Sequence, residues 1–254
     1  EIRTSEENIG AEGNFTRCMS LADSDFTAIF HADDIYDSNI IKKQIETFER
    51  EQGLLAVATH ANTIDINGKK LGERFLPVEL REKKFTKLSF QQLLELTLKY
   101  GNIITCPSVM VKTEVLSKEL KTWNGRDYKS SADLDVWFRI SKLGEFGFIN
   151  LPLINYRMAD VSTSFRMKKN RVARHDIFLV FDTYFTKGIT PELDRFYDFL
   201  VLKDTELRVY NGAVENLAPI KTKYLKVALR STWHLSFFIK ILLIWLFNSL
   251  KIRK

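Results

Sequence analysis

The sequence is poor in the residues that build disulfide scaffolds and zinc sites. It has only two cysteines, Cys18 and Cys106, and their separation matches no metal-ligand spacing. Its four histidines are also scattered, at His31, His60, His175 and His234. These absences argue against a disulfide framework and against a histidine- or cysteine-based metal centre, and we expect both thiols to be buried or inert.

Several common motifs are absent as well. The chain contains no G-x-G-x-x-G, no phosphate loop of the Walker type and no G-x-S-x-G elbow, which weakens dehydrogenase, nucleotidase and hydrolase interpretations. No charged-then-apolar leader follows Glu1. No secretory signal is therefore visible, and a cytoplasmic location is the default expectation.

Acidic residues are missing from the end of the chain. Residues 221–254 instead carry eight basic side chains: Lys221, Lys223, Lys226, Arg230, Lys240, Lys251, Arg253 and Lys254. Removing these eight charges from the net charge of +6 leaves −2 on residues 1–220, so the basicity belongs to the tail. Because its basic residues are interleaved with a long apolar run, nucleic-acid binding is disfavoured.

The apolar run within this tail covers residues 231–250 and holds a single charge, Lys240. Roughly twenty apolar residues suffice to span a bilayer, but Ser236, Asn248 and Ser249 interrupt this run. We favour a basic, amphipathic helix that lies on the anionic cytoplasmic leaflet. A membrane span and a buried core helix are the alternatives.

Strand-like and helix-like segments alternate along the first two thirds of the chain. Apolar, β-branched and aromatic content predicts strands at residues 25–30, 54–59, 107–112 and 146–158, with a hairpin-type turn at 66–68. Helical spacing predicts helices between Ser38 and Gly53 and over 89–101 and 132–144. The alternation predicts an α/β domain with a mixed, mostly parallel sheet and flanking helices. From about residue 168 the pattern becomes helical, with a break at 188–192.

Two adjacent carboxylates, Asp33 and Asp34, follow the predicted strand at 25–30. In an open sheet, ligands bind beyond the carboxyl ends of the strands. Two carboxylates placed there can hold a hard divalent cation that neutralises a substrate diphosphate. The alternative is an ordinary turn, since aspartate favours loops and helix starts.

Asp133 stands at the predicted start of the helix over 132–144. The free N–H groups and the dipole at a helix start favour a carboxylate, and they would keep it ionised and able to act as a base. The alternative role is an N-cap. Asp135 is a second choice for the base, although it should project away from the face formed by Leu134 and Phe138.

Basic residues follow the last predicted strand, at Arg157, Arg166, Lys168, Lys169 and Arg171. Such a cluster can clamp phosphates. The alternative is a solvated charged face, which is the commoner role of a charge run.

The order of these segments resembles the family 2 glycosyltransferases with the GT-A fold. The resemblance runs from residue 1 to about 165 and rests on five motifs: "ENIGAEGNFTRCMSLA" (7–22), "DFTAIFHADDIY" (25–36), "CPSVMVKTEVL" (106–116), "ADLDVWFRISKLG" (132–144) and "LPLINYRMADVSTS" (151–164). Each motif is weak alone, but five in the family order form a specific signal.

The resemblance implies an inverting glycosyltransferase. Asp33 would coordinate Mg²⁺ or Mn²⁺ that bridges the diphosphate of a nucleotide-diphosphate sugar, with Asp34 beside it, and His31 and Arg157 would contact the same donor. Asp133 would be the general base that deprotonates the acceptor hydroxyl. Trp137 would pack the helix and not stack on a sugar.

Three positions depart from the family pattern. His31 replaces the first aspartate of the Asp-x-Asp-type motif, Ala132 replaces a glutamate, and Gly13 replaces an arginine. Relatives also place their first strands ahead of the segment at 7–22. We therefore expect residues 1–167 to be the C-terminal portion of a GT-A domain with its first strands missing, followed by a helical extension over 168–220 and the membrane-associating helix over 221–254.

The expected acceptor is a lipid-linked or surface-polysaccharide glycan, because the tail would hold the protein at the cytoplasmic face of the cytoplasmic membrane, peripherally or through a C-terminal anchor. The alternative from another class is a non-catalytic, membrane-associated scaffold with a transferase-like fold. His31 and Ala132 would then be signs of decay.

Overall fold

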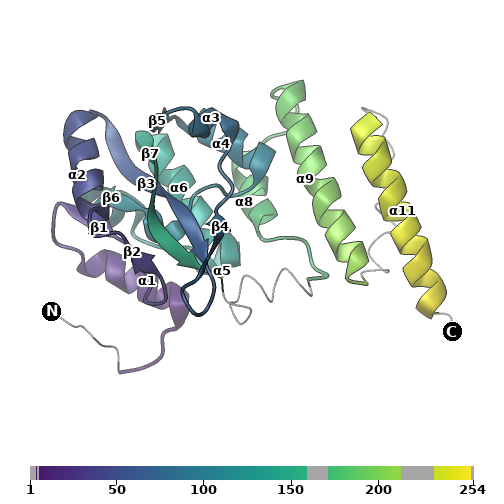
Figure 1. Cartoon of the computed structure of the whole chain (residues 1–254), viewed down its shortest axis with the longest axis horizontal. Coiled ribbons are helices and arrows are strands. Elements are labelled where there is room, and N and C mark those ends of the chain that lie inside the picture. Colours follow the sequence, from purple (N-terminus) through teal and green to yellow (C-terminus); the bar gives the residue numbers. More distant parts are fainter. Residues whose placement is uncertain (1–3, 5, 159–170, 213–231, 253–254) are drawn as a thin grey trace. The chain divides into compact units, whose positions relative to one another are not determined.

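The computed structural model describes residues 4, 6–158, 171–212 and 232–252 (Figure 1). The chain divides into two compact units, Glu1–Ala159 and Asp160–Lys254. The boundary predicted near residue 168 falls within 159–170, outside the described residues, and it stays a prediction.

The first unit is built on a seven-stranded sheet in the order β1-β6-β3-β7-β2, with β4 paired to β3 and β5 paired to β7. The strands are β1 (Phe26–Ala28), β2 (Ile35–Tyr36), β3 (Leu54–Ile64), β4 (Lys70–Glu73), β5 (Phe85–Leu88), β6 (Met110–Lys112) and β7 (Glu145–Arg157). All four predicted strand regions are therefore present. The two long strands, β3 and β7, form the centre of the sheet.

The predicted mixed sheet is confirmed, but the expectation that it is mostly parallel is wrong. Among the described strands, only β3 and β7 run parallel, and the other pairings are antiparallel. One antiparallel pair is the hairpin of β3 and β4, whose turn contains the predicted segment 66–68. The short strands β1 and β2 also run antiparallel to their neighbours in the sheet.

Helices flank the sheet, as predicted. They are α1 (Gly10–Leu21), α2 (Ile40–Arg50), α3 (Val78–Arg81), α4 (Phe90–Tyr100), α5 (Gly125–Tyr128) and α6 (Ala132–Leu143). Helix α2 packs on β3, while α6 packs on β3, β7 and α4. Gly53 ends the segment of α2 with a φ of 83°, a left-handed conformation that favours glycine.

The buried face of α6 fixes this helix against the sheet. Trp137 and Phe138 are fully buried, and the Trp137 ring meets the rings of Trp123 and Phe146 edge to face. The prediction that Trp137 packs the helix is confirmed. Since α6 is anchored in this way, its first turn, which carries Asp133, is held rigidly beside the sheet.

The start of α4 agrees with its prediction, and the start of α2 does not. Ser89 caps α4 in a capping box with Gln92, and Gly101 follows the helix with a φ of 84°. Helix α2 begins after Asn39, which makes no side-chain capping bond, so the predicted cap by Ser38 is wrong. The side-chain bond at the start of this helix comes from Asp37 instead, whose Oδ1 accepts from the Asn39 N–H at 2.8 Å.

These two serines give a stability prediction. Replacing Ser89 with Ala should lower the free energy of unfolding by about 1 kcal/mol, because the Gln92 N–H loses its acceptor at the helix start. Replacing Ser38 with Ala is the matched control and should change it by less than about 0.5 kcal/mol. Urea denaturation followed by circular dichroism measures both, and equal losses would contradict the assigned caps.

The second unit is helical in its described part. It contains α8 (Ile177–Tyr184), α9 (Pro191–Tyr210) and α11 (Thr232–Ile252), in agreement with the predicted helical C-terminal region. The predicted break falls before α9, where the Thr190 side chain accepts from the Leu193 N–H and Pro191 begins the helix. Helices α9 and α11 pack side by side (Figure 1).

In the described parts of the chain, no helix is both long enough and apolar enough to cross a membrane.

Candidate active site

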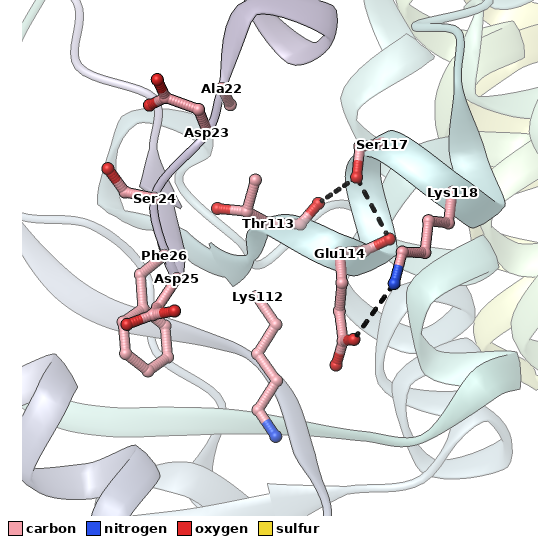
Figure 2. Close-up of a pocket in the computed structure, with 10 residues that line it drawn as sticks. All are labelled: Ala22, Asp23, Ser24, Asp25, Phe26, Lys112, Thr113, Glu114, Ser117 and Lys118. Carbon is pink, nitrogen blue, oxygen red and sulfur yellow. Dashed lines mark hydrogen bonds and ion pairs between the residues drawn. The ribbon is translucent and has the colours of Figure 1, made fainter.

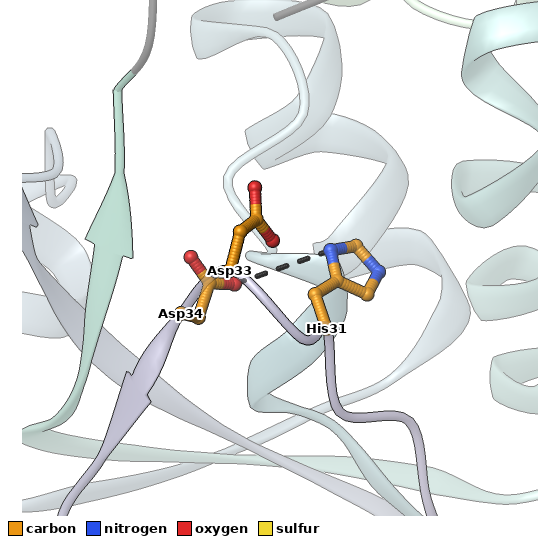
Figure 3. A group of neighbouring side chains, drawn as sticks. All are labelled: His31, Asp33 and Asp34. Carbon is orange, nitrogen blue, oxygen red and sulfur yellow. Dashed lines mark ion pairs between the residues drawn. The ribbon is translucent and has the colours of Figure 1, made fainter. Parts of the chain in front are cut away.

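Three side chains gather in the loop that joins β1 to β2 (Figure 3). His31, Asp33 and Asp34 each present one ligand atom, and these three atoms lie within 4.8 Å of one another. The loop is held by Tyr36, whose hydroxyl accepts a hydrogen bond from the His31 N–H at 2.6 Å. His31 thus lies beside the two predicted carboxylates, and the three side chains form one cluster.

The two carboxylates of this loop differ in environment. Asp33 is exposed, whereas the side chain of Asp34 is only 1% exposed. Asp34 Oδ1 accepts from the backbone N–H of Arg157 at 2.8 Å, and Oδ2 lies 4.0 Å from Nδ1 of His31. Burial raises the pKa of Asp34, with a smaller contribution from the neighbouring charge of Asp33. A positive charge bound beside this carboxylate would therefore be strongly favoured.

The chemistry of the cluster fits a divalent cation. Asp34 Oδ2 is buried without a hydrogen-bond partner, and a buried polar atom in this state is unfavourable unless something binds it. Carboxylate oxygens are the ligands that Mg²⁺ and Mn²⁺ prefer, and imidazole is a common metal ligand. Asp33 and Asp34, with His31 beside them, are thus the residues that can hold such an ion.

Arg157, at the end of β7, fastens this loop to the turn after β3. Its Nε donates to the Asp33 carbonyl at 2.6 Å, and its Nη1 donates to the carbonyls of Asp65 and Ile66, both at 2.8 Å. The structure therefore gives Arg157 a positioning role for the carboxylates. Contact between Arg157 and a donor stays a prediction.

Asp133 is the second residue of α6 and is held by two hydrogen bonds. Its Oδ1 accepts from the Leu134 N–H at 2.8 Å, and its Oδ2 accepts from Asn102 Nδ2 at 3.0 Å. Asn102 is itself oriented by the Ile104 N–H, which donates to Asn102 Oδ1 at 3.1 Å. The carboxylate therefore has a fixed orientation.

The pKa of Asp133 is set mainly by its burial. Burial raises it to about 6, against the opposing effects of the Leu134 and Asn102 hydrogen bonds and of the Arg74 charge. Desolvation thus outweighs the N–H groups of the helix start, and the carboxyl is less acidic than that of an ordinary aspartate. A carboxylate with a pKa near 6 is still ionised at neutral pH, and it is a stronger base than an ordinary aspartate.

Cys106 connects the two groups of carboxylates. Burial raises the pKa of its thiol well above the ordinary value, and the charges of Asp133 and Asp34 raise it further. The thiol thus lies in the electrostatic field of both carboxylates, and it stays protonated at neutral pH. The other cysteine, Cys18, is exposed, so the expectation that both thiols are buried fails for Cys18.

Part of the chain is similar to a known family. Residues 1–118, which include the loop of His31, Asp33 and Asp34 but not Asp133, match the model of the family described as glycosyl transferase family 2. The family predicted from the sequence motifs is confirmed, and with it the enzyme class, a glycosyltransferase.

One solved structure and the curated proteins complete the comparison. The solved structure is that of S. aureus TarS, residues 1–349, in complex with UDP-GlcNAc. Its likeness covers 96% of this chain and 72% of that chain, with a TM-score of 0.46 and 10% sequence identity. No curated protein matches the sequence.

Sequence reasoning missed one charged residue whose field reaches Asp133, Arg74, which directly follows β4. Its guanidinium lies 5.5 Å from the centre of the Tyr156 ring, and its charge lowers the pKa of Asp133 and of Tyr156. In the described part of the chain Arg74 forms no ion pair. The only available signal was its place after the 66–68 hairpin, which brings the end of β4 back toward the long strands.

The other predicted residues lie away from this constellation or outside the described residues. Asp135 is buried and binds Arg139 Nε at 2.9 Å, so it is no competitor for the base. Arg171 belongs to the second unit and pairs with Asp204 at 2.5 Å. The remaining members of the predicted basic cluster, Arg166, Lys168 and Lys169, fall within 159–170.

A pocket at the opposite end of β1 contains none of the predicted site residues (Figure 2). It is lined by the segment 22–26, which leads into β1, by Lys112 at the end of β6, and by residues that follow this strand, among them Glu114 and Lys118. Glu114 and Lys118 pair with each other across 3.9 Å. The loop with His31, Asp33 and Asp34 follows the other end of β1, so this pocket is separate from the candidate site.

Proposed function

We propose that this protein transfers a sugar from a nucleotide-diphosphate sugar to a hydroxyl group with inversion at the anomeric carbon. The observation that carries the proposal is the group of His31, Asp33 and Asp34, whose ligand atoms lie within 4.8 Å of one another in the part of the chain that matches glycosyl transferase family 2. A single displacement requires one group at the leaving diphosphate and one at the attacking hydroxyl, and we assign these roles to this loop and to Asp133.

On the donor side, Asp33 and Asp34 would hold Mg²⁺ or Mn²⁺ against the diphosphate, with His31 as a further ligand or ribose contact. The ion offsets the negative charge that builds up on the leaving nucleotide diphosphate. Arg157 keeps the loop in place through the Asp33 carbonyl and the Asp34 carboxylate. This rigidity matters because the ligand atoms must not move when charge develops.

On the acceptor side, Asp133 takes the proton of the attacking hydroxyl. The acceptor oxygen forms a bond to the anomeric carbon, the bond from that carbon to the diphosphate oxygen breaks, and its electron pair leaves with the nucleotide diphosphate. One in-line displacement inverts the anomeric configuration. Asn102 positions the base, and the Arg74 guanidinium supplies positive charge close to the reacting groups.

For the acceptor we propose a glycan that is lipid-linked or part of a surface polysaccharide, at the cytoplasmic face of the cytoplasmic membrane. Support comes from the basic, apolar tail over 221–254, which is suited to a negatively charged lipid surface.

The proposal is tested by incubating the full-length protein with a UDP-sugar, Mn²⁺ and glycan acceptors, and by reading the product's anomeric configuration by NMR. An inverted linkage supports it. A product that retains the donor's configuration would contradict a single displacement with Asp133 as base.

The pKa of Asp133 gives a pH prediction. Because the base must be deprotonated, kcat should rise as the pH increases through about 6 and level off above it. Replacing Arg74 with Gln removes a charge that lowers this pKa, so the acidic limb should move to higher pH. The exposed Arg195 of α9, replaced with Gln, is the control and should leave the limb in place. An unchanged limb in the Arg74 variant would contradict the electrostatic link to Asp133.

A further inference from the structure

Helix α11 has two apolar sides, and only one of them is covered by described residues of the second unit. Ile241, Ile244 and Trp245 pack on Leu202 and Val209 of α9. A second set of aliphatic side chains is between 38% and 62% exposed: Leu235, Ile239, Leu243 and Leu246. We call these four residues the outer face of α11.

The outer face is a continuous stripe. Its residues recur at i, i+4, i+8 and i+11, which places them within an arc of about 80° at 3.6 residues per turn. Four neighbouring aliphatic side chains in water are unfavourable, and such patches mark interaction surfaces. The stripe is polar along one flank, where Ser236 and Lys240 are exposed and Lys240 pairs with Glu206 of α9.

We propose that the outer face of α11 is a membrane-contacting surface that inserts into the interface of a bilayer rich in anionic lipids. The positive charge of the tail favours an anionic bilayer over a second copy of the chain as the partner of this face. Residues 221–254 carry eight basic side chains and no acidic one, which complements anionic head groups and attracts the segment to their surface. A second copy of the chain would bring a tail of the same sign against this one, which is unfavourable.

The geometry also sets the orientation. With the stripe on one side and α9 on the other, the axis of α11 would lie along the membrane plane, and its aliphatic side chains would reach below the head groups. The inference deepens the proposed location, and in that respect it rests on the proposed function, but the contact itself requires no transferase chemistry.

Vesicle flotation tests the proposal. The full chain should float with vesicles of phosphatidylcholine mixed with phosphatidylglycerol, and much less with phosphatidylcholine alone. The double variant Ile239→Glu/Leu243→Glu should reduce the floated fraction at least tenfold. The matched control is Ile66→Glu/Leu71→Glu, which adds the same charges at two equally exposed positions of the first unit and should float like the wild type.

Two further variants in the same assay separate loss of membrane contact from changes in charge, folding or catalysis. The single variant Leu243→Gln leaves the net charge unchanged and should also weaken flotation, with the helix content checked by circular dichroism. Asp133→Asn should float like the wild type, which separates membrane contact from catalysis. Flotation of the face variants at wild-type level would overturn the proposal. So would a wild-type protein that ignores vesicles but forms a dimer in sedimentation that Leu243→Gln dissociates, since the face would then be an interface between copies.

Discussion

Replacing Asp133 with Asn should lower kcat by roughly 10²–10⁴-fold, the usual contribution of a positioned general base, while binding of the donor is retained. Asn has the shape of Asp, and its amide oxygen can still accept from the Leu134 N–H, while the bond from Asn102 Nδ2 is lost. The geometry of the first turn of α6 should therefore survive. Since burial disfavours the charge at this position, the neutral side chain should not destabilise the fold.

A control from a neighbouring helix makes this result specific. Asp127 is an exposed acidic residue of α5, and Asp127→Asn should leave kcat within about twofold, as expected for a surface change away from the reacting groups. Initial rates of nucleotide-diphosphate release under saturating donor and acceptor give kcat for both variants. If Asp133→Asn transferred sugar at the wild-type rate, Asp133 would be only a residue of the helix start.

Replacing Asp33 with Asn should abolish the dependence of donor binding on Mn²⁺. Asp33 is exposed and only its backbone carbonyl is bonded to Arg157, so its carboxylate is free to bind an ion and its loss should not disturb the loop. Losing a direct ligand should weaken metal-dependent binding by at least roughly 10–100-fold, which is the range seen even for residues that only support a ligand.

The measurement is isothermal titration of UDP in the presence and absence of Mn²⁺. Asp23→Asn, an exposed aspartate ahead of β1, is the matched control and should keep the full metal effect. Binding of UDP that is equal with and without Mn²⁺ in the wild type would mean that the carboxylates of the β1–β2 loop have a structural role only.

Elements with strong local signals were predictable from the sequence. Helix α4 is bounded by Ser89 and Gly101, whose capping and left-handed conformations are encoded in the residues themselves. The apolar run that begins at Leu54 and the one that begins at Phe146 are long enough to specify buried strands, and both lie at the centre of the sheet.

Strand direction was not predictable in the same way. It depends on how many times the chain reverses between two strands, and the β3–β4 hairpin adds a reversal that the alternation of segments does not display. The prediction that Ser38 caps α2 failed because Ser38 and Asn39 are both acceptable caps. Which of them begins the helix depends on the bond from the Asn39 N–H to Asp37.

In the candidate site too, features with a local sequence signal were predictable, and features that depend on the tertiary fold were not. Asp33, Asp34 and Asp133 were found because aspartates at strand ends and helix starts have local signatures. The raised pKa of Asp133 was not predictable from the sequence, since desolvation depends on what covers the carboxyl in three dimensions. Arg74 was missed because its approach to Tyr156 depends on how β4 folds back along β3.

The proposal places the donor diphosphate at Asp33 and Asp34 and the acceptor hydroxyl at Asp133. Its most direct test is a transfer assay with the full-length protein, a UDP-sugar and lipid-linked glycan acceptors, followed by mass spectrometry. We expect one sugar to be added to the acceptor and one UDP to be released, only when Mn²⁺ or Mg²⁺ is present, and no product from Asp133→Asn. A full-length protein that binds UDP with the metal but adds no sugar to any acceptor, or that transfers equally well in the Asp133→Asn form, would contradict this assignment.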